Sequence, residues 1–252
     1  ERVFFTGDIL FNDQHTLNGA RPPLAEVDVL VTEPTRGHTS RDPNCQREAE
    51  IVNLLEATRK TLSNGGSVLL PIFALGRMQE MLLILDEAFR RKVIPSVPVF
   101  CSGLGMDLVN HFHEISRNSN DLCFNRKVLK SVGARPLPRK LIPGRDLPMQ
   151  GIYLVSSGMM VENTPSYVLA TSMLGKDRNS ILFVGYCDPS TPGGKLLETQ
   201  PDEPFEFKEI DWVEPVRAKI HQFDLSGHAD REELVALAKK LSPKTIILHH
   251  GD

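Results

Sequence analysis

Carboxylates and histidines stand beside apolar segments of this sequence. Asp8, Glu33 and His250 each follow an apolar run, and His228 stands just before a helical pattern. Carboxylate oxygens and imidazole nitrogens are ligands that zinc and manganese accept in proteins. Taken singly, each residue also fits a structural role, because an Asp at a strand end commonly forms a turn. Together, the four positions indicate metal chemistry at the edge of a sheet.

The elements that would position these residues alternate between strands and helices. Short β-branched or apolar runs predict strands, and amphipathic stretches predict helices. We expect strands at residues 2–6, 27–32, 67–73, 97–101, 151–155, 180–185 and 244–248, and helices at residues 44–63, 75–90, 104–115, 165–174 and 231–241. This alternation is typical of an α/β fold with a parallel sheet. The carboxyl ends of such strands are where these sheets place chemistry.

Three stretches depart from the alternation. Residues 126–145 are rich in Lys and Arg, lack acidic residues and contain three prolines, which predicts an irregular basic loop. Such a loop either tracks the backbone of a nucleic acid or is simply solvated. Residues 192–194, with the sequence PGG, predict a turn, and residues 204–222 predict two edge strands.

Composition excludes several classes of protein. The chain has 252 residues, 40% hydrophobic and 24% charged, which excludes extensive disorder. A net charge of -3 excludes a wholly basic protein that coats nucleic acid. No stretch approaches the roughly 20 apolar residues of a membrane span. The four cysteines form no CxxC pair, so we expect no disulfide framework, no cysteine zinc site, and a reducing, cytoplasmic setting.

Seven short segments, in order along almost the whole chain, resemble the β-CASP branch of the metallo-β-lactamase superfamily. They are FTGD (5–8), VTEPTRG (31–37), PIFALGRMQE (71–80), SGMM (157–160), VGYC (184–187), SGHAD (226–230) and LHHGD (248–252). The resemblance implies an α/β fold in which a partial metallo-β-lactamase αββα sandwich, residues 1–37 and 222–252, is interrupted by an inserted β-CASP α/β domain, residues 38–221. The family's HxHxDH signature is absent from these 252 residues. We therefore expect the chain to be part of a longer protein and to be inactive by itself.

The resemblance implies a metal-dependent RNA phosphodiester hydrolase. This would be an endoribonuclease, with exonuclease activity left open, that uses hydroxide attack at two zinc ions, with manganese as the alternative metal. Asp8 would bridge the ions and His250 would bind one of them. His228 would lie near the leaving oxygen and Glu33 would orient it, so that the pair donates a proton. The alternative is a non-catalytic β-CASP protein that binds RNA or scaffolds a partner.

Further residues are candidates for substrate binding. Ser156, Ser157 and Gly158 form a small-residue turn whose backbone N–H groups could cradle a phosphate, and a plain tight turn is the alternative. Arg77 could pair with a phosphate or with a carboxylate. Ser226 could touch the substrate, and either Ser226 or Asp230 could instead cap the following helix. We expect RNA as the partner and no membrane, and a homodimer is left open.

Overall fold

The computed structural model describes residues 1–23, 25–41, 46–138 and 141–251. The chain divides into two compact units, unit 1 (Glu1–Arg47 and Ser226–Asp252) and unit 2 (Glu48–Leu225). The sequence assigns residues 38–221 to the inserted domain. Unit 2 begins ten residues after the start of that range and ends four residues after its end. Each unit has its own sheet.

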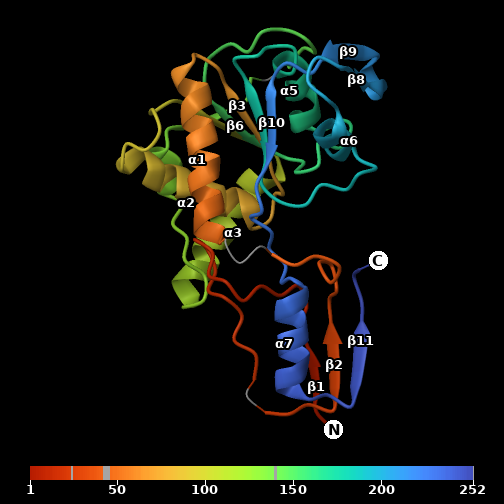
Figure 1. The fold of residues 1–252 in the computed structure, drawn as a ribbon. Helices are drawn as coiled ribbons and strands as arrows, with labels where there is room; N and C mark the ends of the chain where they lie inside the picture. The colour runs from red at the N-terminus through yellow and green to blue at the C-terminus, as the bar shows by residue number, and fades with distance from the viewer. Residues whose placement is uncertain (24, 42–45, 139–140, 252) are drawn as a thin grey trace. The chain divides into compact units, whose positions relative to one another are not determined.

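Unit 1 contains a three-stranded parallel sheet covered by one helix (Figure 1). The strands are β1 (Val3–Phe5), β2 (Val29–Thr32) and β11 (Thr245–Leu248), in the order β1-β2-β11, and the helix is α7 (Arg231–Leu241). Because side chains alternate along a strand, Leu30 of β2 packs in one cluster with Leu237 and Leu241 of α7. The three carboxyl ends of this sheet lead into the loops that carry Asp8, Glu33 and His250.

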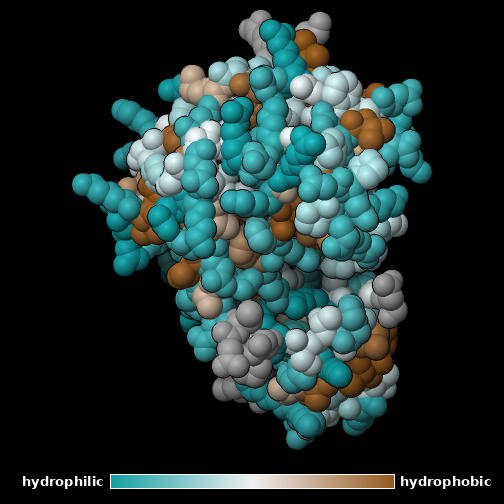
Figure 2. Space-filling view, turned by 45° about the horizontal axis from the view of Figure 1, so that its top comes forward, coloured by the Kyte–Doolittle hydropathy of each residue, from teal (hydrophilic) through white to brown (hydrophobic). Residues whose placement is uncertain are grey.

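The opposite face of this sheet is apolar and open. Phe5 is 68% exposed and Ile247 is 48% exposed, and all four residues of β11 are exposed. Figure 2 shows apolar surface gathered over unit 1 on the side of β11. The sheet of unit 1 therefore has its hydrophobic cluster on the α7 face.

Helix α7 is delimited by its own sequence. The Asp230 carboxylate accepts a hydrogen bond from the N–H of Glu233, and the Glu233 carboxylate accepts one from the N–H of Asp230. This capping box satisfies N–H groups that the first turn leaves open. The helix ends at Leu241, and the next residue, Ser242, adopts the left-handed conformation with φ 44°. Asp230, rather than Ser226, is therefore the cap of the helix.

Unit 2 contains a six-stranded parallel sheet with helices on both faces (Figure 1). Its strand order is β10 (Lys219–Gln222), β7 (Ser180–Phe183), β3 (Val68–Pro71), β6 (Ile152–Val155), β4 (Val99–Ser102) and β5 (Ala134–Pro136). Its helices are α1 (Arg47–Ser63), α2 (Arg77–Arg90), α3 (Leu104–Asn118), α4 (Val128–Ser131), α5 (Pro165–Met173) and α6 (Pro192–Glu198). An antiparallel pair, β8 (Pro204–Phe207) and β9 (Trp212–Pro215), is joined by the 3-10 turn Lys208–Ile210.

The two faces of the larger sheet build separate cores. Leu70 and Leu154 contribute to a cluster with α1, α2 and α3, whereas Leu69 and Tyr153 contribute to a second cluster with α5, α6 and β8. Strands β3, β6 and β7 are buried at every position, as expected for a parallel sheet covered on both sides. The predicted α/β fold class is confirmed. Within the described ranges, no helix combines the length and apolar character needed to cross a bilayer.

The structure corrects three local predictions. The basic stretch contains α4 and the edge strand β5, because the Asn125 side chain accepts from the N–H of Lys127 and Ala134 pairs with Val99 of β4. The PGG segment opens α6, because Thr191 caps it and proline suits the first helical position. Residues 204–222 form three strands, since β8 and β9 pair with each other and β10 joins the larger sheet. The expected helix start at residue 44, and residues 139 and 140 of the basic stretch, lie outside the described residues.

Candidate metal centre

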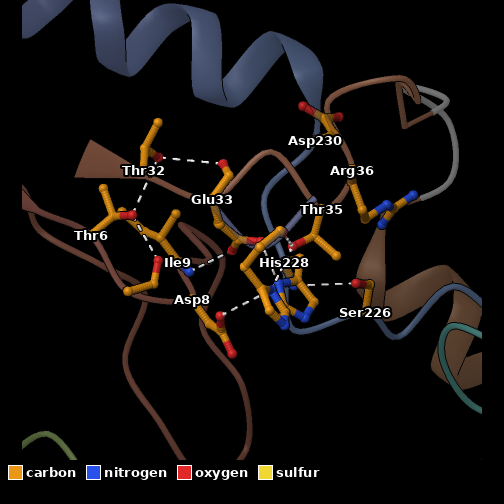
Figure 3. A network of polar contacts seen from close by, with 12 residues as sticks. Thr6, Asp8, Ile9, Thr32, Glu33, Thr35, Arg36, Ser226, His228 and Asp230 are labelled. Carbon is orange, nitrogen blue, oxygen red and sulfur yellow. Dashed lines mark hydrogen bonds and ion pairs between the residues drawn. The ribbon is translucent and has the colours of Figure 1, made fainter. Parts of the chain in front are cut away.

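Glu33 lies directly after β2 and is fully buried. Its Oε1 accepts a 2.7 Å hydrogen bond from the N–H of Ile9, in the loop after β1. Its Oε2 lies 2.6 Å from Nδ1 of His228 (Figure 3). A buried carboxylate needs such partners, because an unpaired charge in the interior is strongly unfavourable. Both oxygens of Glu33 are therefore already in use.

The Glu33–His228 pair shifts the pKa of each partner. Burial acts to raise the pKa of Glu33, but hydrogen bonds from His228, Thr35 and the Ile9 N–H outweigh it, so the pKa is lowered. The hydrogen bond to Glu33 raises the pKa of His228, against the opposing effect of burial, and the charges of Glu33 and Asp8 add to the rise. Each partner therefore favours the charged form of the other.

His228 is held in the loop that precedes α7. Its N–H donates to the hydroxyl of Ser226 over 3.2 Å, and the Ser226 carbonyl accepts from the Arg47 guanidinium over 3.2 Å. Because Nδ1 of His228 faces the Glu33 carboxylate, it carries the proton of that hydrogen bond. The other ring nitrogen, Nε2, is left to exchange a proton with a substrate. The side chain is 23% exposed, so it is reachable.

Asp8 and His250 meet at the open side of the same site. Oδ1 of Asp8 lies 3.8 Å from Nδ1 of His250, and both side chains are well exposed. His250 has a positive φ of 60°, an uncommon backbone conformation for a residue with a side chain. Thr35 holds it there, because its hydroxyl donates to the His250 carbonyl over 2.9 Å and lies 3.2 Å from His250 Nδ1.

The four predicted side chains converge within unit 1. The ring of His228 is stacked near that of His250, with centroids 6.2 Å apart and an interplanar angle of 25°. Asp8, Glu33 and His250 also offer ligand atoms that all lie within 4.8 Å of one another, the one such group among the described residues. Four separate stretches of sequence thus deliver these side chains to one edge of the small sheet.

The donor set fits a metal ion in part. Asp8 and His250 are exposed and supply one carboxylate and one imidazole, which suits zinc or manganese. Glu33 is less suited as a ligand, because Ile9 and His228 already occupy its two oxygens. Two ligands do not close a tetrahedral site. The residues present therefore form part of a metal shell, with Glu33 and His228 beside it.

The predicted substrate-binding residues of unit 2 are placed as follows. The Arg77 guanidinium is paired with the buried carboxylate of Glu80 in the same helix, which matches the carboxylate alternative. Ser156, Ser157 and Gly158 directly follow β6, and the Ser157 hydroxyl accepts from the N–H of Val161. Within the described part of the chain, no hydrogen bond is donated by the N–H groups of Ser157, Gly158 or the next residue, Met159.

Thr35 is a site residue that the sequence reasoning did not single out. It stands two residues after Glu33, in the segment VTEPTRG, so its hydroxyl could have been noticed beside the strand end. Its partner His250 lies 215 positions away in the sequence, and only folding brings the two together.

The fold and the site define a class of α/β protein that carries histidines and carboxylates at the carboxyl end of a parallel sheet. Comparison with known families is more specific. Residues 78–196 match the family model of the Beta-Casp domain, and residues 213–252 match that of the Zn-dependent metallo-hydrolase RNA specificity domain. The chain belongs to the β-CASP family of the metallo-β-lactamase superfamily.

Similar proteins come from archaea and eukaryotes. The chain is 31% identical to the RNase J-like protein of Methanocaldococcus jannaschii, over 100% of this chain and 58% of that protein. It is 30% identical to Endoribonuclease YSH1 of Saccharomyces cerevisiae, over 100% of this chain and 33% of that protein. It is 28% identical to the Integrator complex subunit 11 homolog of Dictyostelium discoideum, over 100% of this chain and 35% of that protein. The chain thus spans between a third and somewhat over half of these relatives.

Proposed function

We propose that this chain is part of a metal-dependent RNA phosphodiester hydrolase, an endoribonuclease of the β-CASP type. Unit 1 is the metallo-β-lactamase part and unit 2 is the β-CASP domain. The observation that carries the proposal is the His228–Glu33 pair, with 2.6 Å between Nδ1 and Oε2, beside the Asp8–His250 pair. The names of relatives such as Endoribonuclease YSH1 support RNA as the substrate.

His228 is the proton donor in this proposal. Glu33 orients the ring through Nδ1 and favours its charged form, so Nε2–H is available to the oxygen that leaves phosphorus. General acid catalysis of this kind accelerates reactions by roughly 10²–10⁴-fold. The Ser226 hydroxyl positions His228 by accepting a hydrogen bond from its backbone N–H, and Ser226 is a candidate to touch the substrate. Buried Glu33 acts through His228, and Asp8 adds negative charge that favours the same imidazolium.

Asp8 and His250 would be the residues of this chain that hold the metal in this proposal. Two zinc ions, with manganese as the alternative, would lower the pKa of water and neutralise charge that develops on the phosphoryl oxygens. Thr35 fixes the backbone and the ring of His250, so that the imidazole stays beside the Asp8 carboxylate.

Unit 2 contributes substrate contacts. The N–H groups of Ser157 and Gly158, next to Ser156, are donors for a phosphate. Arg77 keeps a phosphate-binding role only as a prediction, since its guanidinium already pairs with Glu80. The Lys- and Arg-rich residues of 126–145 would track the RNA backbone, so affinity would fall steeply with salt.

The proposal also includes a cytoplasmic location and leaves the oligomeric state open. The described cysteines, Cys101, Cys123 and Cys187, are all free thiols, which favours a reducing, cytoplasmic setting. A homodimer is left open and is decided by measuring the mass of the protein in solution.

The test compares His228→Ala with Asp8→Ala in the natural polypeptide that carries this sequence. Cleavage of a labelled RNA and bound zinc, by elemental analysis, are measured on the same samples. His228→Ala should lower turnover by roughly 10²–10⁴-fold while retaining metal. Asp8→Ala should lower both.

The outcomes separate the alternatives. Equal loss of metal and turnover in His228→Ala would move that histidine into the metal shell. An unmodified protein that binds RNA and zinc, yet cleaves no RNA, would favour the non-catalytic RNA-binding alternative. An exposed histidine of unit 2, His111 of α3, supplies the matched control, and His111→Ala should change neither quantity.

A further inference from the structure

Most aromatic side chains of this chain are buried or half-buried. All Phe, Tyr and Trp residues lie in the described ranges, and three of them are exposed: Phe5, Phe73 and Tyr186. Phe5 belongs to unit 1. Phe73 and Tyr186 belong to unit 2, with exposed fractions of 41% and 53%. An exposed aromatic ring offers a flat surface on which a nucleic-acid base can stack.

The two rings stand at the same edge of the larger sheet. Strand β3 ends two residues before Phe73, and β7 ends three residues before Tyr186. The two strands pair in parallel, with Val68 opposite Ser180. Both residues therefore lie just beyond the carboxyl ends of strands that are neighbours in the sheet. Open α/β sheets bind their ligands at this edge.

Phe73 packs against the turn that follows β6. A Cβ atom built on Gly158 would lie 2.9 Å from Cδ2 and 3.0 Å from Cε2 of the Phe73 ring. Only a glycine at position 158 lets the ring lie this close to the turn after β6, and the remainder of the ring is open to solvent. The preformed position means that little conformational entropy is lost when a flat group stacks on it.

Tyr186 is also oriented. Its phenol hydrogen-bonds to the Asp188 carboxylate. That carboxylate is itself fixed, because it accepts from the Ser190 hydroxyl over 2.5 Å and from the Ser190 N–H over 2.7 Å. Hydrogen bonds from Ser190 and from Tyr186 lower the pKa of Asp188, so it stays an acceptor at neutral pH.

Donors for phosphate lie beside the Phe73 ring. Ser157, Gly158 and Met159 have N–H groups that donate no hydrogen bond within the described residues. Gly158 is the residue against which Phe73 packs. A flat apolar surface next to backbone N–H donors matches a nucleotide, which presents a base and a phosphate in turn.

We propose that Phe73 and Tyr186 form a base-stacking subsite for single-stranded RNA at the carboxyl edge of the unit 2 sheet. The inference rests on the proposed function in one respect, that the polymer is RNA. Stacking on aromatic rings tolerates every base, because each base has a flat π face. The subsite therefore grips unpaired RNA with little preference for sequence.

A protein surface is the competing occupant, and the same loop offers a way to tell the two apart. Leu75 is 69% exposed and stands two residues after Phe73. An apolar protein partner would bury Leu75 together with Phe73, whereas a stacked base requires an aromatic ring. Leu75→Ala is therefore the matched control for Phe73→Leu.

The experiment measures binding in the absence of metal, so that RNA stays intact. Fluorescence anisotropy with EDTA gives the affinity for labelled oligo(U), oligo(A) and an abasic oligonucleotide of the same length. Phe73→Leu and Tyr186→Leu should each weaken binding of both base-containing probes by roughly 5- to 100-fold. Binding of the abasic probe should not change. Phe73→Trp should retain or strengthen binding, and Leu75→Ala should leave every affinity unchanged.

Several results would overturn the proposal. Equal weakening for the abasic probe would mean that the rings do not stack bases. A Leu75→Ala effect as large as that of Phe73→Leu would indicate apolar docking of protein. If Phe73→Leu fails to fold, Tyr186→Leu decides alone. Normal RNA cleavage with unchanged affinity in both Leu variants would reject the subsite and leave the proposed function standing. Absence of RNA binding by the unmodified protein would reject both.

Discussion

Strands β6 and β11 have similar composition and opposite surroundings. Both are four-residue apolar strands in parallel sheets, yet β6 is buried at every position and β11 is exposed at every position. In unit 2, helices cover both faces of the sheet, whereas the hydrophobic cluster of unit 1 lies on its α7 face. The sheet of unit 2 therefore lies between two hydrophobic clusters, whereas the sheet of unit 1 has one cluster and carries the polar candidate site at its strand ends.

The sharpest test of this contrast is Glu33→Gln. Removing the charge should lower RNA cleavage by roughly 10²–10⁴-fold, because His228 loses the carboxylate that favours its charged form. The basic limb of the pH–rate profile should move to lower pH, since Glu33 raises the pKa of His228. Hydrogen exchange in unit 2, followed by mass spectrometry, should not change. Glu56→Gln on α1 is the control and should leave activity intact.

The same pair makes the stability of unit 1 depend on pH. The folded-state pKa of Glu33 is lowered, so its contribution is present above its ordinary pKa and is lost as pH falls through the lowered value. The folded-state pKa of His228 is raised, so its contribution is present below its ordinary pKa and is lost as pH rises through the raised value. Stability should therefore be highest between the two values. A flat profile in unfolding experiments would contradict the ion pair.

The packing side of the contrast is tested by Leu154→Ala and Ile247→Ala. Leu154 in β6 is fully buried, and its truncation should cost about 2–5 kcal/mol of unfolding free energy. Ile247 in β11 is 48% exposed, and its truncation should cost about 1 kcal/mol. Denaturant unfolding measures both. Equal losses would show that β11 is covered in solution and would remove the contrast.

Thr35→Val tests the support of the metal ligand. The variant keeps the shape of the side chain and loses the hydroxyl that contacts His250. Partners of metal-binding histidines typically contribute 10- to 100-fold in metal affinity, so zinc should bind weaker by roughly that factor in calorimetry. Thr35→Ser retains the hydroxyl and should behave like the unmodified protein. Unaltered affinity in Thr35→Val would exclude this role.

The smallest expected effect is at the far end of the unit 1 sheet. The Asp28 carboxylate, bonded to Lys244 and to the N–H of Arg2, has its pKa lowered to about 2. Its contribution to stability is present above its ordinary pKa of 3.8 and is lost as pH falls toward about 2. The carboxyl chemical shift in an NMR titration reports this value directly. A midpoint near 3.8 would show that the exposed pair does not persist in solution.

Local signals in the sequence predict much of this fold. The apolar runs and the helical patterns place most elements of the six-stranded sheet, because strand and helix periodicities survive in the residue order. The failures come where short-range signals compete. Pro192 and two glycines predict a turn, yet Thr191 caps a helix there. Strand β5 in the basic stretch could not be predicted, because it forms by pairing with β4, whose residues lie more than thirty positions away in the sequence.

The site shows the same division. Residue type and position beside strand ends single out Asp8, Glu33, His228 and His250, and their chemical roles stay proposals. The sequence by itself determined the alternation of strands and helices and the polar residues that follow them, because both depend on residues that are close together in the sequence. Only the tertiary structure decided that Thr35 holds His250, that Arg77 pairs with Glu80 and that Phe73 lies open against Gly158. These contacts depend on side-chain positions that parallel pairing, capping and packing set in three dimensions.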